Sequence, residues 1–163
     1  MASASRVPNL AVLIDAENVS HRIADALFKT IAEFGVPRAR RIYGDFSNAC
    51  LGSWVGAIAK HAIIAQQVFN GKNASDVALI VGAVELLHTG RFDGFCIVSS
   101  DSDFTGLAQH IREKGVDVLG FGKRNAAESF RRSCSRFIFT EDLRPAVPAG
   151  RAAGVKRDIS LSS

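Results

Sequence analysis

The strongest constraint on the fold is an alternation between short apolar runs and segments whose apolar residues recur every three or four positions. The first run, "NLAVLIDA" at residues 9–16, is continuous and ends in an acid, as is typical of a strand buried on both faces of a parallel sheet. The next segment has helical spacing from Ile23 to Phe34, and Gly35 then ends the predicted helix. The same reasoning predicts strands near 39–45, 63–69, 95–98, 116–122 and 136–140, and helices near 51–58, 75–89, 104–114 and 126–132.

This order of elements predicts the class of fold. Strands that are each separated by a helix indicate βαβ units, so we expect an α/β domain with a doubly wound parallel sheet of five to six strands. Helices should cover both faces, in a Rossmann-like arrangement of three layers. In the third helix we expect the stripe Val77, Ile80, Val81, Val84 and Leu87 to face the core.

The chain is long enough for one domain and short for two. It has 163 residues, of which 47% are hydrophobic. We expect the domain to span residues 9–143, after a flexible N-terminus at 1–8. Residues 144–163, "RPAVPAGRAAGVKRDISLSS", have no usable apolar period and are rich in Pro, Ala, Gly and basic residues, so we expect a flexible tail or a linker to another domain.

Composition and charge bear on the location of the protein, on the state of its cysteines and on its partners. No apolar run approaches the length of a membrane span, and the first residues lack an export signal, so we expect a cytoplasmic protein. Cys50, Cys96 and Cys134 are scattered singly, which favours free thiols over a zinc site or disulfides. The net charge of +4 and the pI of about 9.3 are compatible with a polyanionic partner.

Four aspartates are predicted to share one edge of the sheet. Asp15 and Asp101 close strands, whereas Asp76 and Asp103 fall in the first turns of the helices that follow, and all these positions lie at the carboxyl edge. Each has an ordinary alternative role, as a helix cap, a turn residue or a partner of a helix dipole. Together, however, four like charges cost free energy unless a cation offsets them. Carboxylates without His or Cys favour Mg²⁺ or Mn²⁺, with a phosphate ester as the substrate.

The motifs "LIDAEN", "GKNASDVAL", "GRFDGFCIVSSDSDF" and "GFGKRN", in this order, give the chain its family resemblance. It resembles the NYN domains, which are PIN-like nuclease domains of the LabA-like group and are often joined to an OST-HTH (LOTUS) module. The resemblance covers residues 9–143. It implies a metal-dependent ribonuclease whose catalytic and metal-binding residues are Asp15, Asp76, Asp101 and Asp103.

Supporting residues follow from the predicted edge. Asn18, Ser99 and Ser100 are candidates for holding a carboxylate, a water or a phosphate, although capping and turn formation would explain them equally well. Basic residues in the loops of the same edge are candidates for contacts with the RNA backbone. These are Lys72, Lys123 and Arg124.

One departure from the family pattern keeps a second function open. Many relatives carry another aspartate about two turns into the third helix, where this chain has Gly82. Gly82 would either point away from the edge or leave a gap there. It favours the alternative of an RNA-binding module with the nuclease fold and little or no catalysis. For partners we expect single-stranded or structured RNA, and we allow for a homodimer and for an OST-HTH domain beyond this chain.

Two other classes of protein gather acids at such an edge, but neither matches the residues. A haloacid-dehalogenase-type phosphatase needs a second aspartate two residues after Asp15, where this chain has Glu17. A response-regulator receiver would explain Lys123, but it needs an acid at the end of the third strand, and "QQVFNGK" contains none.

Overall fold

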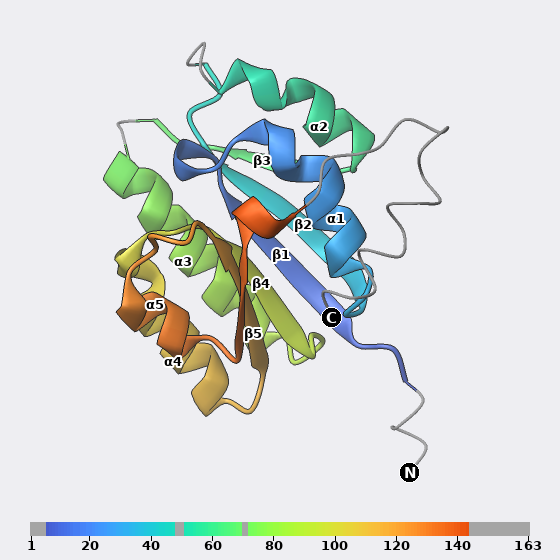
Figure 1. Cartoon of the computed structure of the whole chain (residues 1–163), viewed down its shortest axis with the longest axis vertical. Helices are drawn as coiled ribbons and strands as arrows, with labels where there is room; N and C mark the ends of the chain where they lie inside the picture. The colour runs from blue at the N-terminus through green and yellow to red at the C-terminus, as the bar shows by residue number, and fades with distance from the viewer. Residues whose placement is uncertain (1–5, 48–50, 70–71, 144–163) are drawn as a thin grey trace.

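A computed structural model describes residues 6–47, 51–69 and 72–143 of the chain. The predictions for residues 1–5, for Cys50 and for the tail at 144–163 lie outside these residues. Within them the chain forms one sheet with helices on both of its faces (Figure 1).

The sheet has six strands in the order β3-β2-β1-β4-β5-β6, and every neighbouring pair is parallel. The chain runs outward from β1 to β3 and then crosses back to β4, which pairs with the other side of β1. The predicted doubly wound parallel sheet is therefore confirmed, with its switch point between β1 and β4. The strands are β1 (Asn9–Asp15), β2 (Val36–Gly44), β3 (Ile64–Gln67), β4 (Gly94–Val98), β5 (Asp117–Gly122) and β6 (Arg136–Phe139).

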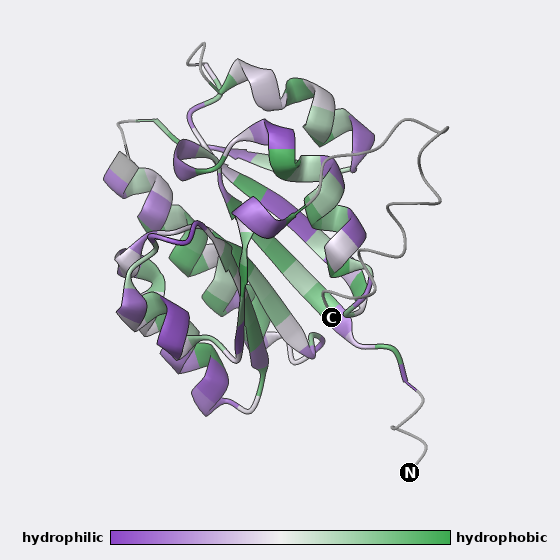
Figure 2. Cartoon of the chain, viewed as in Figure 1, coloured by the Kyte–Doolittle hydropathy of each residue, from purple (hydrophilic) through white to green (hydrophobic). Residues whose placement is uncertain are grey.

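Two apolar layers, one on each face, hold the helices to the sheet. Along β1, Val12 and Ile14 pack on the face covered by α1 (Ala24–Ile31) and α2 (Val55–Lys60). Ala11 and Leu13 point to the other face, which is covered by α3 (Lys72–His88), α4 (Thr105–Glu113) and α5 (Glu128–Ser133). Figure 2 shows the apolar strands at the centre, with hydrophilic residues on the outer turns of α4 and α5. No helix of the described segments is long and apolar enough to cross a membrane.

Helix α3 corrects two predictions. It begins at Lys72 rather than near residue 75, so Asp76 lies one turn inside the helix and not in its first turn. The predicted core stripe is also wrong in part, because Val77 and Val81 are 59% and 50% exposed. The apolar residues of α3 lie on all sides of the helix, so their spacing does not predict which side packs on the sheet. The face that packs on the sheet carries Leu79 and Ala83 instead.

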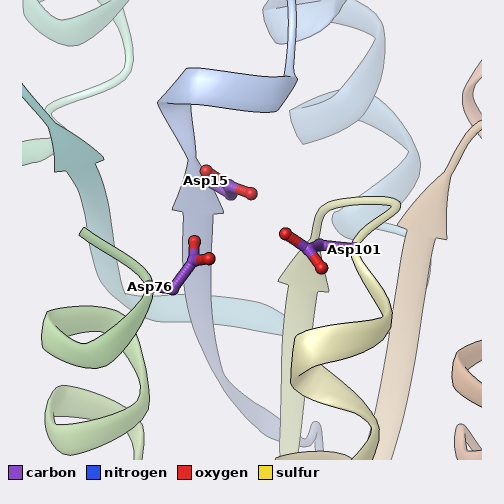
Figure 3. Close-up of side chains that lie close together, drawn as sticks. All are labelled: Asp15, Asp76 and Asp101. Atoms are coloured by element: carbon purple, nitrogen blue, oxygen red, sulfur yellow. The ribbon is translucent and has the colours of Figure 1, made fainter. Parts of the chain in front are cut away.

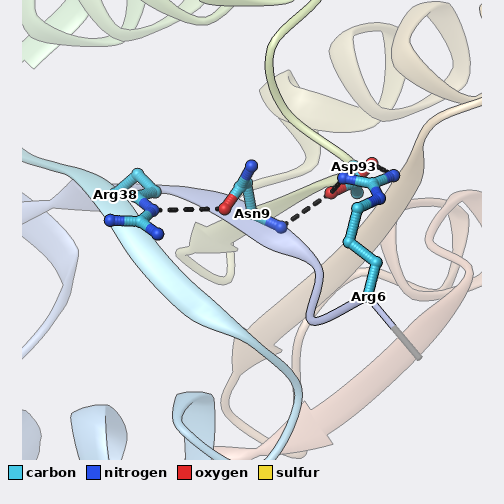
Figure 4. Close-up of polar contacts among 4 residues, drawn as sticks. All are labelled: Arg6, Asn9, Arg38 and Asp93. Atoms are coloured by element: carbon cyan, nitrogen blue, oxygen red, sulfur yellow. Dashed lines mark hydrogen bonds and ion pairs between the residues drawn. The ribbon is translucent and has the colours of Figure 1, made fainter. Parts of the chain in front are cut away.

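The amino end of β1 is held by polar contacts (Figure 4). The Asp93 carboxylate, just before β4, accepts a hydrogen bond of 2.7 Å from the Asn9 backbone N–H and pairs with the Arg6 guanidinium. On the other side, Arg38 of β2 donates to the Asn9 side-chain oxygen at 3.2 Å. These contacts fix the start of the central strand against both neighbours.

Two of the three cysteines are described, and both are free and buried. Burial raises the pKa of the Cys96 thiol to about 12 and that of Cys134 to about 11. The prediction of free buried thiols is confirmed for these two residues, and such thiols are poor nucleophiles at neutral pH.

Candidate active site

Three aspartates from three separate elements meet at the carboxyl edge of the sheet. Asp15 is the last residue of β1, Asp76 lies near the start of α3, and Asp101 follows β4 (Figure 3). One carboxylate oxygen from each lies within 4.8 Å of the others. They meet because β1 and β4 are neighbours at the switch point, so that their carboxyl ends lie side by side, and because α3 begins beside the end of β1.

The cluster is largely shielded from water. The Asp15 and Asp76 residues are 1% and 5% exposed, and Asp101 is half-buried. Loss of solvation raises the pKa of Asp15 above its usual value, and the charge of Asp101 adds to this effect, while hydrogen bonds from Asn18 and Ser99 oppose it. The negative charge of Asp15 is therefore costly in the protein alone, as expected for a carboxylate placed to face a cation.

Hydrogen bonds fix the Asp15 carboxylate through one of its two oxygens. Asn18 Nδ2 and Ser99 Oγ both donate to Asp15 Oδ2, at 2.7 and 2.8 Å. The other oxygen, Oδ1, is buried and has no hydrogen-bond partner within the described part of the chain. Two donors thus orient the carboxylate and leave a buried oxygen available to a ligand.

The turn after β4 carries Asp101 and Asp103 into different surroundings. Ser99 Oγ accepts from the Asp101 backbone N–H at 3.1 Å, and Asp101 Oδ1 accepts from the Asp103 N–H at 2.9 Å. Asp101 therefore caps the short 3-10 turn at Ser102–Phe104, so the capping alternative is confirmed and coexists with a place in the cluster. Asp103 lies within this turn with an exposed side chain, and the structure does not bring it into the group of three.

The loops after β4 and β5 are joined by Ser100. Its hydroxyl accepts a hydrogen bond of 2.8 Å from the Lys123 backbone N–H, rather than contacting one of the three carboxylates. This bond places the exposed Lys123 on the same edge as the cluster. Lys72 is the first residue of α3, and its side chain lies outside the described part of the structure.

Arg124 is already engaged by acidic and aromatic neighbours. Its backbone N–H donates to the Glu141 carboxylate at 3.0 and 3.1 Å, its guanidinium pairs with Asp142, and the guanidinium carbon lies 4.7 Å from the centre of the Phe139 ring. A phosphate would therefore compete with Asp142 for this cation. Lys123, the other basic residue after β5, has an exposed side chain.

Sequence reasoning missed a second polar network beside the cluster. Glu17, in the turn after β1, accepts from the Asp45 backbone N–H at 3.2 Å. Gln67 Nε2 donates to Asp45 Oδ1 at 2.7 Å, and Gln67 Oε1 accepts from the Phe46 N–H at 2.9 Å. These bonds tie together the carboxyl ends of β1, β2 and β3. Glu17 stood out in "LIDAEN" as an acid, whereas nothing in the local sequence singled out Asp45 or Gln67.

Gly82 faces a neighbouring strand and not the carboxylates. It lies six residues beyond Asp76, or about 9 Å along the helix axis. Gly82 is buried, and a Cβ atom built on it would lie 2.2 Å from the Tyr43 hydroxyl oxygen of β2. Of the two expectations for Gly82, the gap is excluded, because the Tyr43 side chain fills the space beside it.

The donor set suits a hard divalent cation. All three converging side chains offer oxygen, which Mg²⁺ and Mn²⁺ prefer, whereas zinc sites usually include His or Cys. The buried Asp15 Oδ1, which has no hydrogen-bond partner among the described residues, is an atom that a cation would satisfy. The residues present therefore fit such an ion.

Comparisons with known proteins agree with this architecture. The chain resembles a solved structure titled as a protein of unknown function, VPA0982, from Vibrio parahaemolyticus RIMD 2210633, with a TM-score of 0.70 and 16% sequence identity over 87% of this chain and 98% of that one. At this identity the likeness shows the fold alone. No curated protein matches the chain. The model of the NYN domain matches residues 9–143, so the chain belongs to the NYN domain family, a family of nuclease-type enzymes.

Proposed function

We propose that this protein is a Mg²⁺- or Mn²⁺-dependent ribonuclease that hydrolyses RNA phosphodiester bonds. The observation that carries the proposal is the cluster of Asp15, Asp76 and Asp101 at the switch point of the sheet, with oxygens within 4.8 Å of one another. Open α/β sheets bind their ligands at this place. Like charges at such distances are costly without a cation, and hard cations in carboxylate sites usually complete their shell with phosphate oxygens.

The three aspartates are the residues that would hold the ion. When bound there, a divalent cation supplies activation of water and neutralises charge on the leaving oxygen. Asn18 and Ser99 keep the Asp15 carboxylate in one orientation, so its Oδ1 remains available to a ligand. Ser99 also accepts the Asp101 N–H and thereby links the two acids of neighbouring strands.

Asp103 acts from further out in this proposal. Its side chain is exposed, and it lies two residues beyond Asp101, whose carboxylate accepts the Asp103 N–H. We assign to Asp103 a contact mediated by water, in place of a direct bond to the ion. Replacing Asp103 should then lower the rate less than replacing Asp101.

The RNA backbone would be held by basic loops of the same edge. Lys123 is exposed and is positioned by the bond between its own N–H and Ser100. Lys72 and Arg124 complete the proposed set, with Arg124 exchanging Asp142 for a phosphate. Such contacts position a strand without reading its sequence.

The alternative of a binding module without catalysis drew its support from Gly82. That residue packs against Tyr43, about two turns from Asp76, so its identity leaves the three-carboxylate cluster intact. We therefore favour the nuclease over the binding module.

The deciding experiment is cleavage of a labelled single-stranded RNA with Mn²⁺ or Mg²⁺ by wild type and by Asp101→Asn. Asp117→Asn is a matched control, because Asp117 is an exposed aspartate at the opposite, amino end of β5. All three proteins are checked for folding by heat denaturation. Cleavage that requires the metal, survives in Asp117→Asn and is lost in Asp101→Asn supports the proposal. RNA that is bound by wild type but left whole would establish the binding module instead.

The products give an independent test of the chemistry. Attack by water leaves a 5′-phosphate and a 3′-hydroxyl on the two fragments. Attack by the 2′-oxygen of the RNA would instead leave a 2′,3′-cyclic phosphate, and finding that product would exclude the proposed reaction.

A further inference from the structure

An exposed aromatic ring stands on the same edge of the sheet as the carboxylates. Phe69 follows β3 and is 61% exposed. Among the large apolar side chains that are exposed in the described residues, it is the only aromatic one. A Phe ring left in water forgoes the favourable free energy of burial and presents an accessible apolar face.

The backbone that leads to Phe69 is anchored. The Val68 N–H donates to the Gly44 carbonyl oxygen at 2.9 Å, which extends the contact between β3 and β2 up to the residue before Phe69. Gln67 is also bonded to both Phe46 and Asp45. The ring is therefore presented from the fixed end of a strand.

The order of the strands places this ring on one side of the acidic cluster and Lys123 on the other. β3 is two strands away from β1, which at the usual spacing puts the ends of these strands about 10 Å apart along the edge. Lys123 follows β5, on the far side of β4. An extended strand that lies along this edge would pass Phe69, the three aspartates and Lys123 in that order.

We propose that Phe69 is a stacking platform for one unpaired base of the RNA, two strands away from the carboxylates that receive the scissile phosphodiester. This inference rests on the proposed function for the identity of the ligand. The faces of bases in a duplex are covered by their neighbours, so a platform of this kind selects single-stranded segments. The π-face of any base can stack on the ring, so Phe69 adds affinity with little sequence preference.

Binding of RNA in a background that does not cleave tests the platform. Asp101→Asn is used as the parent, in the full chain, with a fluorescein-labelled single-stranded RNA of mixed sequence. Onto this parent are added Phe69→Ala, Phe69→Trp and, as a control, Ile64→Ala. Ile64 is 59% exposed and starts the same strand, at the amino edge of the sheet away from the cluster. We expect Phe69→Ala to weaken binding by roughly 5- to 150-fold, and Phe69→Trp and Ile64→Ala to bind like the parent.

A second experiment measures the affinity for a series of RNAs that each lack one base, at a different position in each RNA. A change of Phe69 that only disturbed the structure would not alter how affinity depends on the position of the missing base. The parent should lose affinity strongly when the abasic site occupies one particular position, and Phe69→Ala should not. Equal affinity of parent and Phe69→Ala, failure of Phe69→Trp to bind like the parent, or no binding by the parent would each overturn the platform.

The two proposals fail in different ways. If wild type cleaves RNA but Phe69→Ala binds it normally, the platform is wrong and the nuclease stands. If wild type binds RNA through Phe69 but never cleaves it, the nuclease is wrong and the platform stands.

Discussion

The contact between Gly82 and Tyr43 allows a prediction worked directly from the structure. In Gly82→Ala the new Cβ would lie 2.2 Å from the Tyr43 hydroxyl oxygen, whereas contacts of Cβ atoms under 3.0 Å essentially do not occur. The two atoms must therefore separate by at least 3.0 − 2.2 = 0.8 Å. Tyr43 is only 3% exposed and packs in the core beside α3, so its ring has little room to move.

The expected magnitude combines two opposing terms. Overpacking of a filled core costs about 1–3 kcal/mol, whereas Gly→Ala inside a helix favours folding by about 0.5–1 kcal/mol. We therefore expect Gly82→Ala to lower the free energy of unfolding by about 1–2 kcal/mol, which for a chain of this size is a loss of several °C in Tm.

Tyr43→Phe provides the matched suppressor. It removes the oxygen at 2.2 Å and leaves the ring carbon at 3.2 Å, a contact that a shift of a few tenths of an ångström would relieve. Since the Tyr43 hydroxyl is buried without a hydrogen-bond partner among the described residues, its loss alone should be neutral or stabilising. In this background Gly82→Ala should stabilise the protein by about 0.5–1 kcal/mol, so the two positions couple by about 2 kcal/mol.

Wild type, the two single variants and the double variant form a double-mutant cycle, and urea denaturation measures the free energy of unfolding of each. Trp54 is the single tryptophan of the sequence and is 1% exposed, so its fluorescence reports the loss of the core. A Gly82→Ala variant as stable as wild type, or effects that simply add in the double variant, would refute the packing described for α3 against β2.

Other predictions address the cluster and the amino end of β1. Without divalent ions, Asp15→Asn should be more stable than wild type at pH 7, because the raised pKa of Asp15 means that ionising it in the folded protein costs free energy. This gain should begin to shrink as the pH falls through the raised pKa and should be gone at the ordinary carboxyl value of about 4, which a pH series of heat denaturation would show. Ser99→Ala removes the donor to Asp15 and the acceptor of the Asp101 N–H, and should cost about 1–3 kcal/mol in urea denaturation, against no change if these bonds are unimportant. Mn²⁺ at 100 times its Kd should stabilise wild type by about 2.7 kcal/mol and Asp101→Asn much less, as measured by the shift in Tm; equal shifts in both proteins would place the ion elsewhere. Asp93→Asn should be less stable than wild type at neutral pH, because Arg6 and the Asn9 N–H lower the pKa of Asp93. This stabilisation is present above the ordinary carboxyl pKa and is lost as the pH falls through the lowered pKa of Asp93. If heat denaturation shows that the variant remains less stable than wild type at low pH, the role given to Asp93 is contradicted.

The local pattern of the sequence was sufficient to predict the sheet. A strand with a continuous apolar run, such as the one ending at Asp15, must be buried on both faces of the sheet. Such burial is typical of a parallel sheet covered by helices, so the pattern predicts the α/β class. The ends of the elements were less predictable. Val68 and Phe69, the last residues of the strand predicted at 63–69, lie outside β3, because β3 is an edge strand whose register with β2 runs from Ile64 to Gln67. Pairing with a neighbour, which the local sequence does not contain, sets such limits.

By itself the sequence determined the sheet, its carboxyl edge and the acids that lie on that edge, because the alternation of strand and helix and the residues that follow each strand are local properties. Tertiary structure alone decided that Asp15, Asp76 and Asp101 converge while Asp103 stays exposed, and that Asn18 and Ser99 leave one oxygen of Asp15 without a hydrogen-bond partner among the described residues. It also decided that Val77 and Val81 face water and that Tyr43 fills the place beside Gly82. These outcomes depend on distances between segments far apart in the chain, and such distances are set by packing across the sheet rather than by the period of any one segment.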